Sequence, residues 1–260
     1  MGSGGRLARA RAGAWPGDEC AEDEPARRPV QVRRRRSHRA DRARGPRGGP
    51  VSADRLVASR LIGIVRLDDL DLAVAAATCA IDAGLGAVEV TFTLPSAATA
   101  IDRLRAARPK ALIGAGTVRH ANELEAAIAA GAQFLVAPGL NAELVQAAQR
   151  AGITMLPGVF TASEVDLALR LGADLLKLFP AEPSGPAYLA ALLQPFPAAR
   201  LVPTGGIGPE NASAYLKAGA VAVAMGSSLF PARRIMSEGP EVVAALVERA
   251  LAAVTREVTR

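Results

Sequence analysis

Eight short apolar runs, repeated along most of the chain, limit the folds that this sequence can adopt. They alternate with Ala- and Leu-rich stretches of helical character at intervals of about 20–25 residues. Runs that are apolar on both faces are typical of strands in a buried parallel sheet. Eight such units in about 200 residues predict an α/β fold, a (β/α)8 TIM barrel. The runs are Leu61–Val65, Ala87–Phe92, Ala111–Ala115, Gln133–Ala137, Ile153–Pro157, Asp174–Phe179, Arg200–Pro203 and Val221–Met225.

Glycines follow five of the helical stretches and precede the next strand. Glycine there accepts the left-handed conformation that ends a helix. The five are Gly84, Gly131, Gly152, Gly172 and Gly219. An open, doubly wound sheet is the alternative fold, but no Gly-rich dinucleotide turn follows the first predicted strand.

Helix starts are marked as well. We predict one start at Ser163 before Glu164 and another at Gly208-Pro209-Glu210, with proline in the first turn. A final helix is expected from about Pro240 to Val258, packed on the last strand.

The first fifty residues differ from the rest in composition. They carry 13 Arg and 6 acids, a net charge of +7, whereas the other 210 residues carry 18 Lys and Arg and 19 acids, a net charge of −1. A segment this polar cannot bury enough apolar surface to offset its ordering entropy. We therefore predict a disordered Arg/Gly/Pro-rich extension over residues 1–50 and the barrel over residues 51–260.

This extension has three candidate interpretations. A nucleic-acid arm would normally interleave aromatic residues with the arginines, and a transit peptide would avoid the acidic cluster at residues 18–24. The third interpretation is a start-site artefact, with Val51 encoded by the true start codon. Intact mass of the protein from its native host would decide, because a mass that includes residues 1–50 excludes the artefact.

Several classes of protein are disfavoured by composition. Two cysteines, Cys20 and Cys79, do not indicate a disulfide framework and favour a reducing compartment. No apolar run reaches the roughly 18–20 residues that span a bilayer. His38 and His120 are isolated, so no metal cluster is visible and we expect no metal.

Lys177 lies within the sixth run, with two apolar residues on each side. The pKa of a free lysine is about 10.4, and desolvation can lower it by about 3–5, which leaves much of the amine neutral and nucleophilic at pH 7. Lys177 is therefore a candidate for an imine-forming nucleophile. The alternative is a lysine whose stem packs while its ammonium group reaches water.

Glu89 lies within the second run, between Val88 and Val90. A buried carboxyl group needs a partner or a chemical role. Imine formation and C–C cleavage both require protons to be moved near the imine carbon, so Glu89 is a candidate general acid–base. A structural ion pair is the alternative.

The loops after the last two strands are rich in glycine. Thr204-Gly205-Gly206 and Gly226-Ser227 follow the seventh and eighth runs, where barrels usually bind phosphate through backbone N–H groups. Two more candidates lie at strand ends. Arg66 could bind a carboxylate or form a surface ion pair, and Thr117 could bind a carboxylate or cap a helix.

Seven strings in chain order now match one family. Residues 56–258 resemble the 2-keto-3-deoxy-6-phosphogluconate (KDPG) and 4-hydroxy-2-oxoglutarate (KHG) aldolases. The strings are Glu89-Val-Thr, Gly114-Ala-Gly-Thr-Val118, Ala137-Pro-Gly139, Leu156-Pro-Gly158, Lys177-Leu-Phe-Pro180, Pro203-Thr-Gly-Gly-Ile207 and Gly226-Ser227.

The resemblance implies a class I aldolase that needs no cofactor, is cytoplasmic and forms a homotrimer. It implies that Lys177 forms the imine with pyruvate or the keto acid and that Glu89 shuttles protons. Thr117, Pro138 and Phe179 would line the pyruvate pocket. The distal phosphate would be held by Thr204, Gly205, Gly206, Gly226 and Ser227.

Substrate recognition departs from the family pattern at one position. Some members bind the substrate carboxylate with an arginine four residues after the glutamate, where this chain has Thr93. Other members share the threonine and carry an arginine where this chain has Arg66, so we expect Arg66 and Thr93 to bind substrate.

The expected reaction is cleavage of 2-dehydro-3-deoxy-6-phosphogluconate to pyruvate and glyceraldehyde 3-phosphate. The resemblance also implies cleavage of 4-hydroxy-2-oxoglutarate to pyruvate and glyoxylate. The alternatives are an aldolase for the 6-phosphogalactonate analogue and a non-covalent phosphate-binding synthase or isomerase. Neither nucleic acid nor a membrane is expected as a partner.

Overall fold

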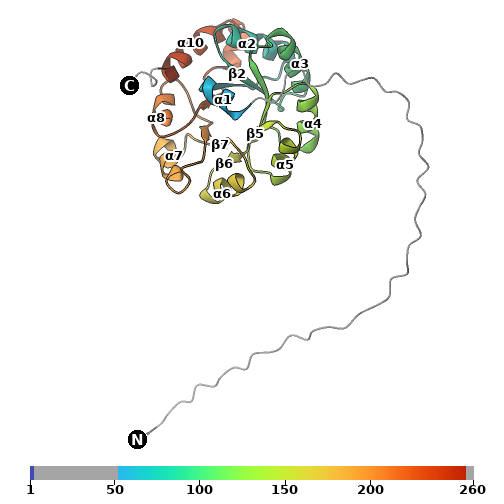
Figure 1. The fold of residues 1–260 in the computed structure, drawn as a ribbon. Coiled ribbons are helices and arrows are strands. Elements are labelled where there is room, and N and C mark those ends of the chain that lie inside the picture. Colours follow the sequence, from blue (N-terminus) through green and yellow to red (C-terminus); the bar gives the residue numbers. More distant parts are fainter. Residues whose placement is uncertain (3–51, 256–260) are drawn as a thin grey trace, which may run out of the picture. The chain divides into compact units, whose positions relative to one another are not determined.

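The computed structural model describes residues 1–2 and 52–255, and residues 52–255 form the predicted barrel. Parallel strands lie at the centre, and helices surround them as an outer ring (Figure 1). The predicted extension lies outside the described residues, apart from Met1 and Gly2.

Every strand pair in the barrel is parallel. Six strands hydrogen-bond in the order β5-β4-β3-β2-β1-β9, and three more in the order β6-β7-β8. A parallel bridge between Thr204 and Ala224 joins β8 to β9. Each predicted run overlaps one strand, and only β3 extends past its run, by one residue. These strands are β1 (Leu61–Val65), β2 (Ala87–Thr91), β3 (Leu112–Gly116), β4 (Phe134–Val136), β5 (Thr154–Leu156), β7 (Leu176–Leu178), β8 (Leu201–Pro203) and β9 (Val223–Met225).

A short additional strand, β6 (Gly158–Val159), continues the direction of β5 after Pro157. Proline has no N–H to donate to a sheet, so the ladder is interrupted there. Its carbonyl still serves the next strand, because it accepts the backbone N–H of Lys177 at 3.0 Å. The interruption therefore lies directly beside the candidate nucleophile.

Helices separate the strands and pack on their outer faces. The five glycines predicted to end helices all have positive φ, between 67° and 109°, as expected. The helices are α1 (Ala53–Ser59), α2 (Leu70–Asp82), α3 (Ala97–Ala107), α4 (Ala121–Ala129), α5 (Ala142–Arg150), α6 (Ala162–Arg170), α7 (Gly185–Leu193), α8 (Ala212–Lys217), α9 (Ala232–Glu238) and α10 (Val242–Thr255).

Both predicted helix starts were wrong by a few residues. Helix α6 is capped by Thr161, not Ser163, and its capping box pairs Thr161 with Glu164. Helix α8 begins at Ala212, because the Asn211 side chain bonds backward to Gly206 and Gly208 and folds the preceding residues into a turn. Proline at 209 therefore belongs to a loop.

Alternate residues of each strand fill the inside of the barrel. This inner cluster includes Ile62, Leu112, Phe134, Leu175 and Val202, and it is separate from the larger cluster between strands and helices. Phe134 occupies the space that a side chain on β3 would need, since a Cβ on residue 114 would lie 2.5 Å from its ring. Below the strand ends, the barrel is thus a packed core.

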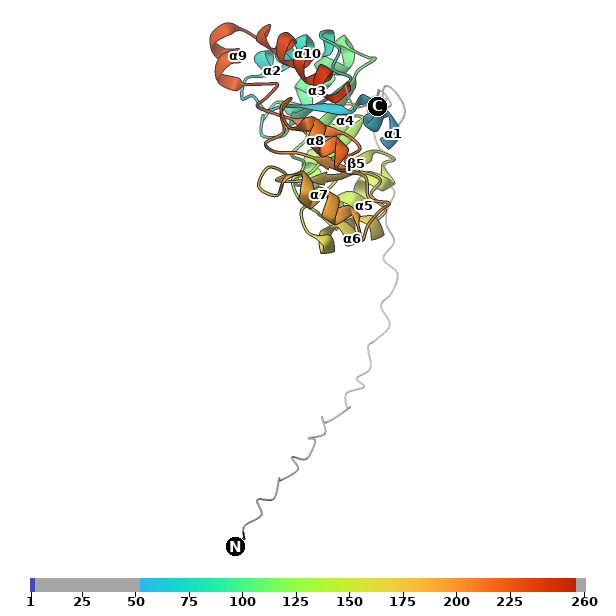
Figure 2. The ribbon, with the colours of Figure 1, turned by 90° about the vertical axis from the view of Figure 1, so that its left-hand side faces the viewer.

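Helix α1 closes one end of this inner core. Its Ala53 and Leu56 belong to the inner cluster, and Leu56 is fully buried. The side view shows α1 and α9 at opposite ends of the barrel (Figure 2). The end that carries the carboxyl termini of the strands is therefore the one left for a ligand.

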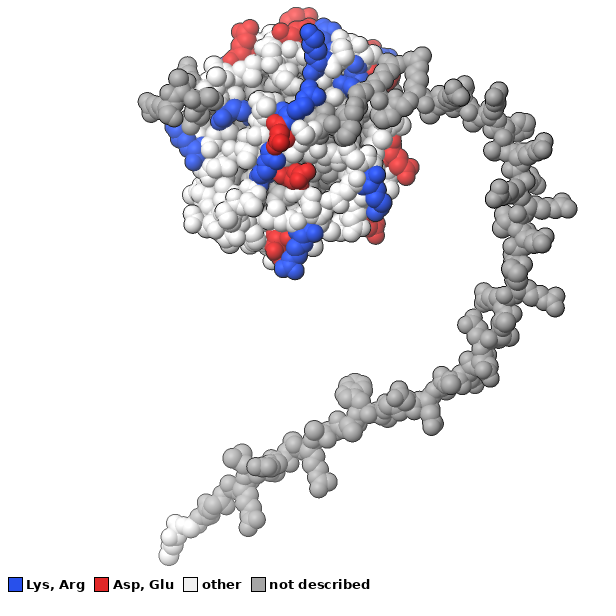
Figure 3. Space-filling model, in the orientation of Figure 1, with Lys and Arg blue, Asp and Glu red and all other residues white. Residues whose placement is uncertain are grey.

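On the face that carries α1, acidic and basic side chains are mixed (Figure 3). Arg200 and Asp54 form an ion pair there, with 2.7 Å between Nη2 and Oδ1. Within residues 52–255, none of the helices has the length and apolar composition to cross a membrane.

Candidate active site

The alternation of the strands places the predicted site residues inside the barrel mouth. Each lies two positions beyond a residue of the inner cluster, and side chains two positions apart on a strand share a face. The pairs are Ile64 with Arg66, Ala87 with Glu89, Leu175 with Lys177, Val202 with Thr204, and Ala224 with Gly226. Glu89 on β2 and Lys177 on β7 thus both point inward.

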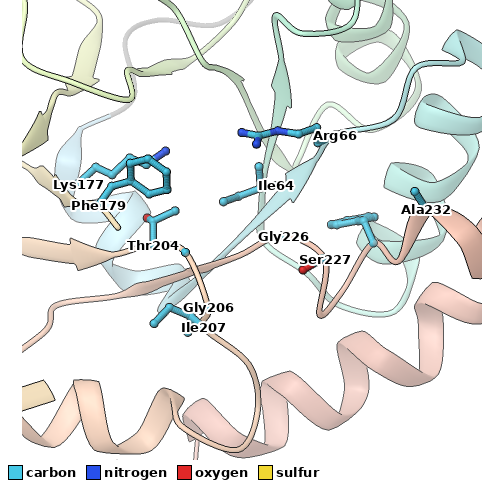
Figure 4. Close-up of a pocket in the computed structure, with 12 residues that line it drawn as sticks. Ile64, Arg66, Lys177, Phe179, Thr204, Gly206, Ile207, Gly226, Ser227 and Ala232 are labelled. Atoms are coloured by element: carbon cyan, nitrogen blue, oxygen red, sulfur yellow. The ribbon is translucent and has the colours of Figure 1, made fainter. Parts of the chain in front are cut away.

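A cavity of about 290 Å³ opens among these strand ends (Figure 4). Eight predicted residues line it: Arg66, Lys177, Phe179, Thr204, Gly205, Gly206, Gly226 and Ser227. The lining also contains Ile64, Ile207, Phe230 and Ala232, which were not predicted as site residues. Ile64 could have been predicted, because it lies two positions before Arg66 and side chains two positions apart on a strand share a face. Phe230 and Ala232 follow a loop, where the sequence has no periodic pattern.

Lys177 is almost fully enclosed, with 4% of its surface exposed. Burial lowers the pKa of the Lys177 amine, and the nearby charge of Arg66 lowers it further, while Glu89 acts in the opposite direction. The amine lies 4.9 Å from the centre of the Phe179 ring. In Figure 4 the guanidinium group of Arg66 and the amine of Lys177 point toward each other. The site therefore favours the neutral amine, which is the nucleophilic form.

Glu89 is 1% exposed. Burial raises the pKa of its carboxyl group, whereas the charges of Lys177 and Arg66 lower it. The carboxyl group occupies the space beside Gly116, where a Cβ would lie 2.5 Å from Oε1. In the described part of the chain Oε1 has no hydrogen-bond partner. A buried carboxyl group with a free oxygen is suited to exchange a proton with a ligand.

Phe179 connects the lysine to the first glycine-rich loop. Its ring approaches the amine of Lys177, and a Cβ on Gly205 would lie 3.1 Å from the ring. Gly205 and Gly206 have φ of 90° and 70°, a conformation that residues with a side chain rarely adopt. The loop can therefore approach both the ring and a ligand closely.

The ends of β1, β2 and β3 form a polar cluster beside the lysine. Arg66 donates a long hydrogen bond of 3.4 Å to the Thr117 hydroxyl group, and Thr117 has a positive φ of 58°. The hydroxyl groups of Thr91 and Thr93 lie 2.8 Å apart, and Thr91 also bonds the Val65 carbonyl. These contacts bring Arg66 and Thr117 together at the ends of β1 and β3.

Some predicted residues lie outside the cavity lining. Glu89 interacts electrostatically with Lys177 from across the barrel, and Thr117 reaches the cavity through Arg66. Thr93 is exposed at the rim. Pro138 lines a separate groove of about 220 Å³ with Val118 and Leu140, so its place in the pyruvate pocket stays a prediction.

No group of three or more His, Cys, Asp or Glu residues gathers in a way that could hold a metal within the described ranges. The expectation of a metal-free reaction stays a prediction as well.

Known proteins share the sequence and the fold that carry this site. A family model described as "KDPG and KHG aldolase" matches residues 53–246. The chain belongs to this aldolase family. A 2-dehydro-3-deoxy-phosphogluconate aldolase of Treponema pallidum is 38% identical over 193 residues, which cover 74% of this chain and 92% of the relative.

Two further relatives bear on substrate and mechanism. A 2-dehydro-3-deoxy-6-phosphogalactonate aldolase of Escherichia coli is 36% identical over 190 residues, covering 72% of this chain and 93% of the relative. A KDPG aldolase of Legionella pneumophila, solved with pyruvate captured as a covalent carbinolamine intermediate, superposes with a TM-score of 0.70 at 33% identity, covering 75% of this chain and 95% of that one. The resemblance predicted from the seven strings is thus confirmed.

Proposed function

We propose that this chain is a class I aldolase that cleaves 2-dehydro-3-deoxy-6-phosphogluconate to pyruvate and glyceraldehyde 3-phosphate. The observation that carries the proposal is the enclosed amine of Lys177, whose pKa is lowered by burial, in a cavity that also holds Arg66. Membership of the aldolase family supports the same chemistry.

The reaction begins when the neutral Lys177 amine attacks the C2 ketone. Glu89, in its protonated form, supplies the proton needed for loss of water, which gives a protonated imine and the Glu89 carboxylate. This imine withdraws electrons and makes the C3–C4 bond easier to break. Glu89, as the carboxylate, accepts the proton of the C4 hydroxyl group directly or through a water. The aldehyde leaves, and the enamine remains on Lys177.

Reprotonation of the enamine at C3 completes the cycle. Glu89 now carries a proton, and its raised pKa makes it able to return that proton. Hydrolysis of the resulting protonated imine releases pyruvate, restores the neutral amine and returns a proton to the Glu89 carboxylate. One carboxyl group thus serves as base and then as acid.

The two ends of the substrate would be held by different chemistry. Arg66 would bind the carboxylate next to the imine, and this role is supported by its guanidinium group, which faces the lysine (Figure 4). Backbone N–H groups of Gly205, Gly206 and Gly226 would hold the phosphate at the opposite side of the cavity. Cleavage of 4-hydroxy-2-oxoglutarate needs only the first of these sites.

Because the relative from E. coli is a 2-dehydro-3-deoxy-6-phosphogalactonate aldolase, the 6-phosphogalactonate analogue is an alternative substrate for this chain. The two sugar acids differ in configuration, so cleavage rates measured with both would identify the preferred one. We also propose a homotrimer located in the cytoplasm and a reaction without a cofactor, on the basis of the family resemblance.

Trapping with borohydride and pyruvate tests the imine mechanism directly. Peptide mass spectrometry should find reduced pyruvate on the peptide that carries Lys177. A Lys177→Arg variant should lose the adduct, and a Lys110→Arg variant, altered at an exposed turn, should retain it. Folded wild-type protein that gives no adduct at neutral pH would overturn the proposal.

A further inference from the structure

Thr91 is a fully buried hydroxyl residue that the proposed mechanism does not use. It ends β2, two positions after Glu89, and is 0% exposed. Its Oγ1 donates to the carbonyl of Val65 at 3.2 Å and lies 2.8 Å from Oγ1 of Thr93. Its hydroxyl group thus links the ends of β1 and β2 through two contacts, one of them with the carbonyl group just before Arg66.

The direction of these bonds follows from counting hydrogens. A hydroxyl group has one hydrogen, and the Val65 carbonyl can only accept, so the hydrogen of Thr91 points to Val65. Thr93 must then donate to Thr91. In this arrangement Thr93 offers only lone pairs outward, which makes it a poor donor for the carboxylate of a substrate.

The acceptor of the Thr91 bond directly precedes Arg66. Fixing the Val65 carbonyl fixes the peptide plane between Val65 and Arg66, and with it the direction in which the arginine side chain leaves β1. Arg66 needs such support. Its own side chain is exposed, and its hydrogen bond to Thr117 is long at 3.4 Å.

We propose that Thr91 is a positioning residue for carboxylate recognition. Its bond to the Val65 carbonyl directs the guanidinium group of Arg66 to the place beside Lys177 where the carboxylate of a 2-keto acid must lie. This inference rests on the proposed function, and it assigns carboxylate recognition to Arg66 without Thr93, with Thr91 as the support.

The test measures the pyruvate concentration that gives half-maximal trapping of Lys177 by borohydride. A Thr91→Val variant keeps the shape of the side chain and loses the hydroxyl group. We expect its half-saturation concentration to rise about tenfold, while trapping at saturating pyruvate stays within about twofold of wild type, since misplacement weakens binding before it affects the amine. Thr91→Ser should restore the wild-type value.

A double-variant cycle separates positioning from a general structural role. In an Arg66→Met background, Thr91→Val should have no further effect, because the group through which Thr91 acts is gone. An undiminished effect in that background would overturn the proposal, and so would a Thr91→Val variant with the wild-type half-saturation value.

Thr78→Val is the matched control. Thr78 is a partly buried threonine on helix α2, outside the cavity lining, and its hydroxyl group donates to the Val74 carbonyl at 2.7 Å. It should leave half-saturation unchanged. If Thr91→Val does not fold, Thr91→Cys replaces it, since a thiol is a weak donor of similar size to serine.

Failure of the proposed function would look different. If wild-type protein forms no adduct with pyruvate, the aldolase mechanism fails, and the role of Thr91 fails with it. If wild-type protein forms the adduct and the Thr91 variants match it at every pyruvate concentration, only the role of Thr91 is overturned.

Discussion

Burial shifts the proton affinities of Lys177 and Glu89 in opposite directions. It lowers the pKa of the amine and raises the pKa of the carboxyl group, so both groups are moved toward their neutral forms. Proton transfer is easiest when the acid and the base have similar pKa values. Burial thereby brings the pKa values of these two side chains closer together.

Replacing Glu89 by glutamine should remove proton transfer without removing the nucleophile. We expect kcat for cleavage to fall by about 10²–10⁴-fold, the usual contribution of a general acid–base. Trapping with borohydride should still detect pyruvate on Lys177. A Glu125→Gln variant, altered on the exposed surface of α4, serves as the control. Normal turnover of the Glu89 variant would remove this residue from the mechanism.

Replacing Arg66 by methionine should change the pH dependence of imine formation. The positive charge of Arg66 lowers the pKa of Lys177, so its removal raises that pKa and leaves less neutral amine at a given pH. At saturating pyruvate, the rate of trapping should therefore reach half its maximum at a higher pH than in wild type.

An unchanged midpoint, or one at lower pH, would show that the charge of Arg66 does not act on the amine. Arg119→Met is the control, because Arg119 is exposed and is not among the groups that shift the Lys177 pKa. Its midpoint should equal that of wild type.

At the scale of elements, sequence analysis did not predict helices α1 and α9, which lie at opposite ends of the barrel (Figure 2). Helices α1 and α9 have seven residues each, too few for a helical period to stand out. The strands were found because eight apolar runs repeat at a regular interval. Helix ends were found because glycine marks them. Helix starts were missed because they depend on which side chain bonds the nearby backbone, as Thr161 and Asn211 do.

Helix α1 nevertheless contributes to the core. Leu56 is fully buried against the inner cluster, so Leu56→Ala should lower the free energy of unfolding by about 2–5 kcal/mol. Urea denaturation measures the loss. Arg55→Ala on the exposed side of the same helix should change stability by less than about 0.5 kcal/mol. Equal effects of the two substitutions would show that α1 does not seal the barrel.

At the scale of the whole molecule, the periodic pattern was enough to predict a closed parallel barrel, because short connections place successive parallel strands side by side. The pattern also indicated Lys177 and Glu89, since charged residues are rare in buried strands. It could not indicate which side chains enclose the cavity. Phe230 reaches it from a loop, and Pro138 lies in another groove, and both placements depend on how the loops fold.

The proposed trimer is a property of the whole molecule that no single chain displays. Sedimentation equilibrium should give three times the mass of the chain. The value should stay constant as the protein is diluted through the micromolar range, as expected for a stable oligomer. A mass equal to that of one chain at all concentrations would exclude the trimer.

The closed end of the barrel has a consequence for the order in which the products are released. Because α1 and the packed inner cluster fill the barrel beneath Lys177, both fragments of a cleaved substrate must leave through the same opening of the cavity. The fragment nearer the mouth departs first, and the one bound to the lysine waits behind it. Product-inhibition kinetics should accordingly have the signature of a fixed sequence, with pyruvate the last to leave and, in the direction of synthesis, the first to arrive.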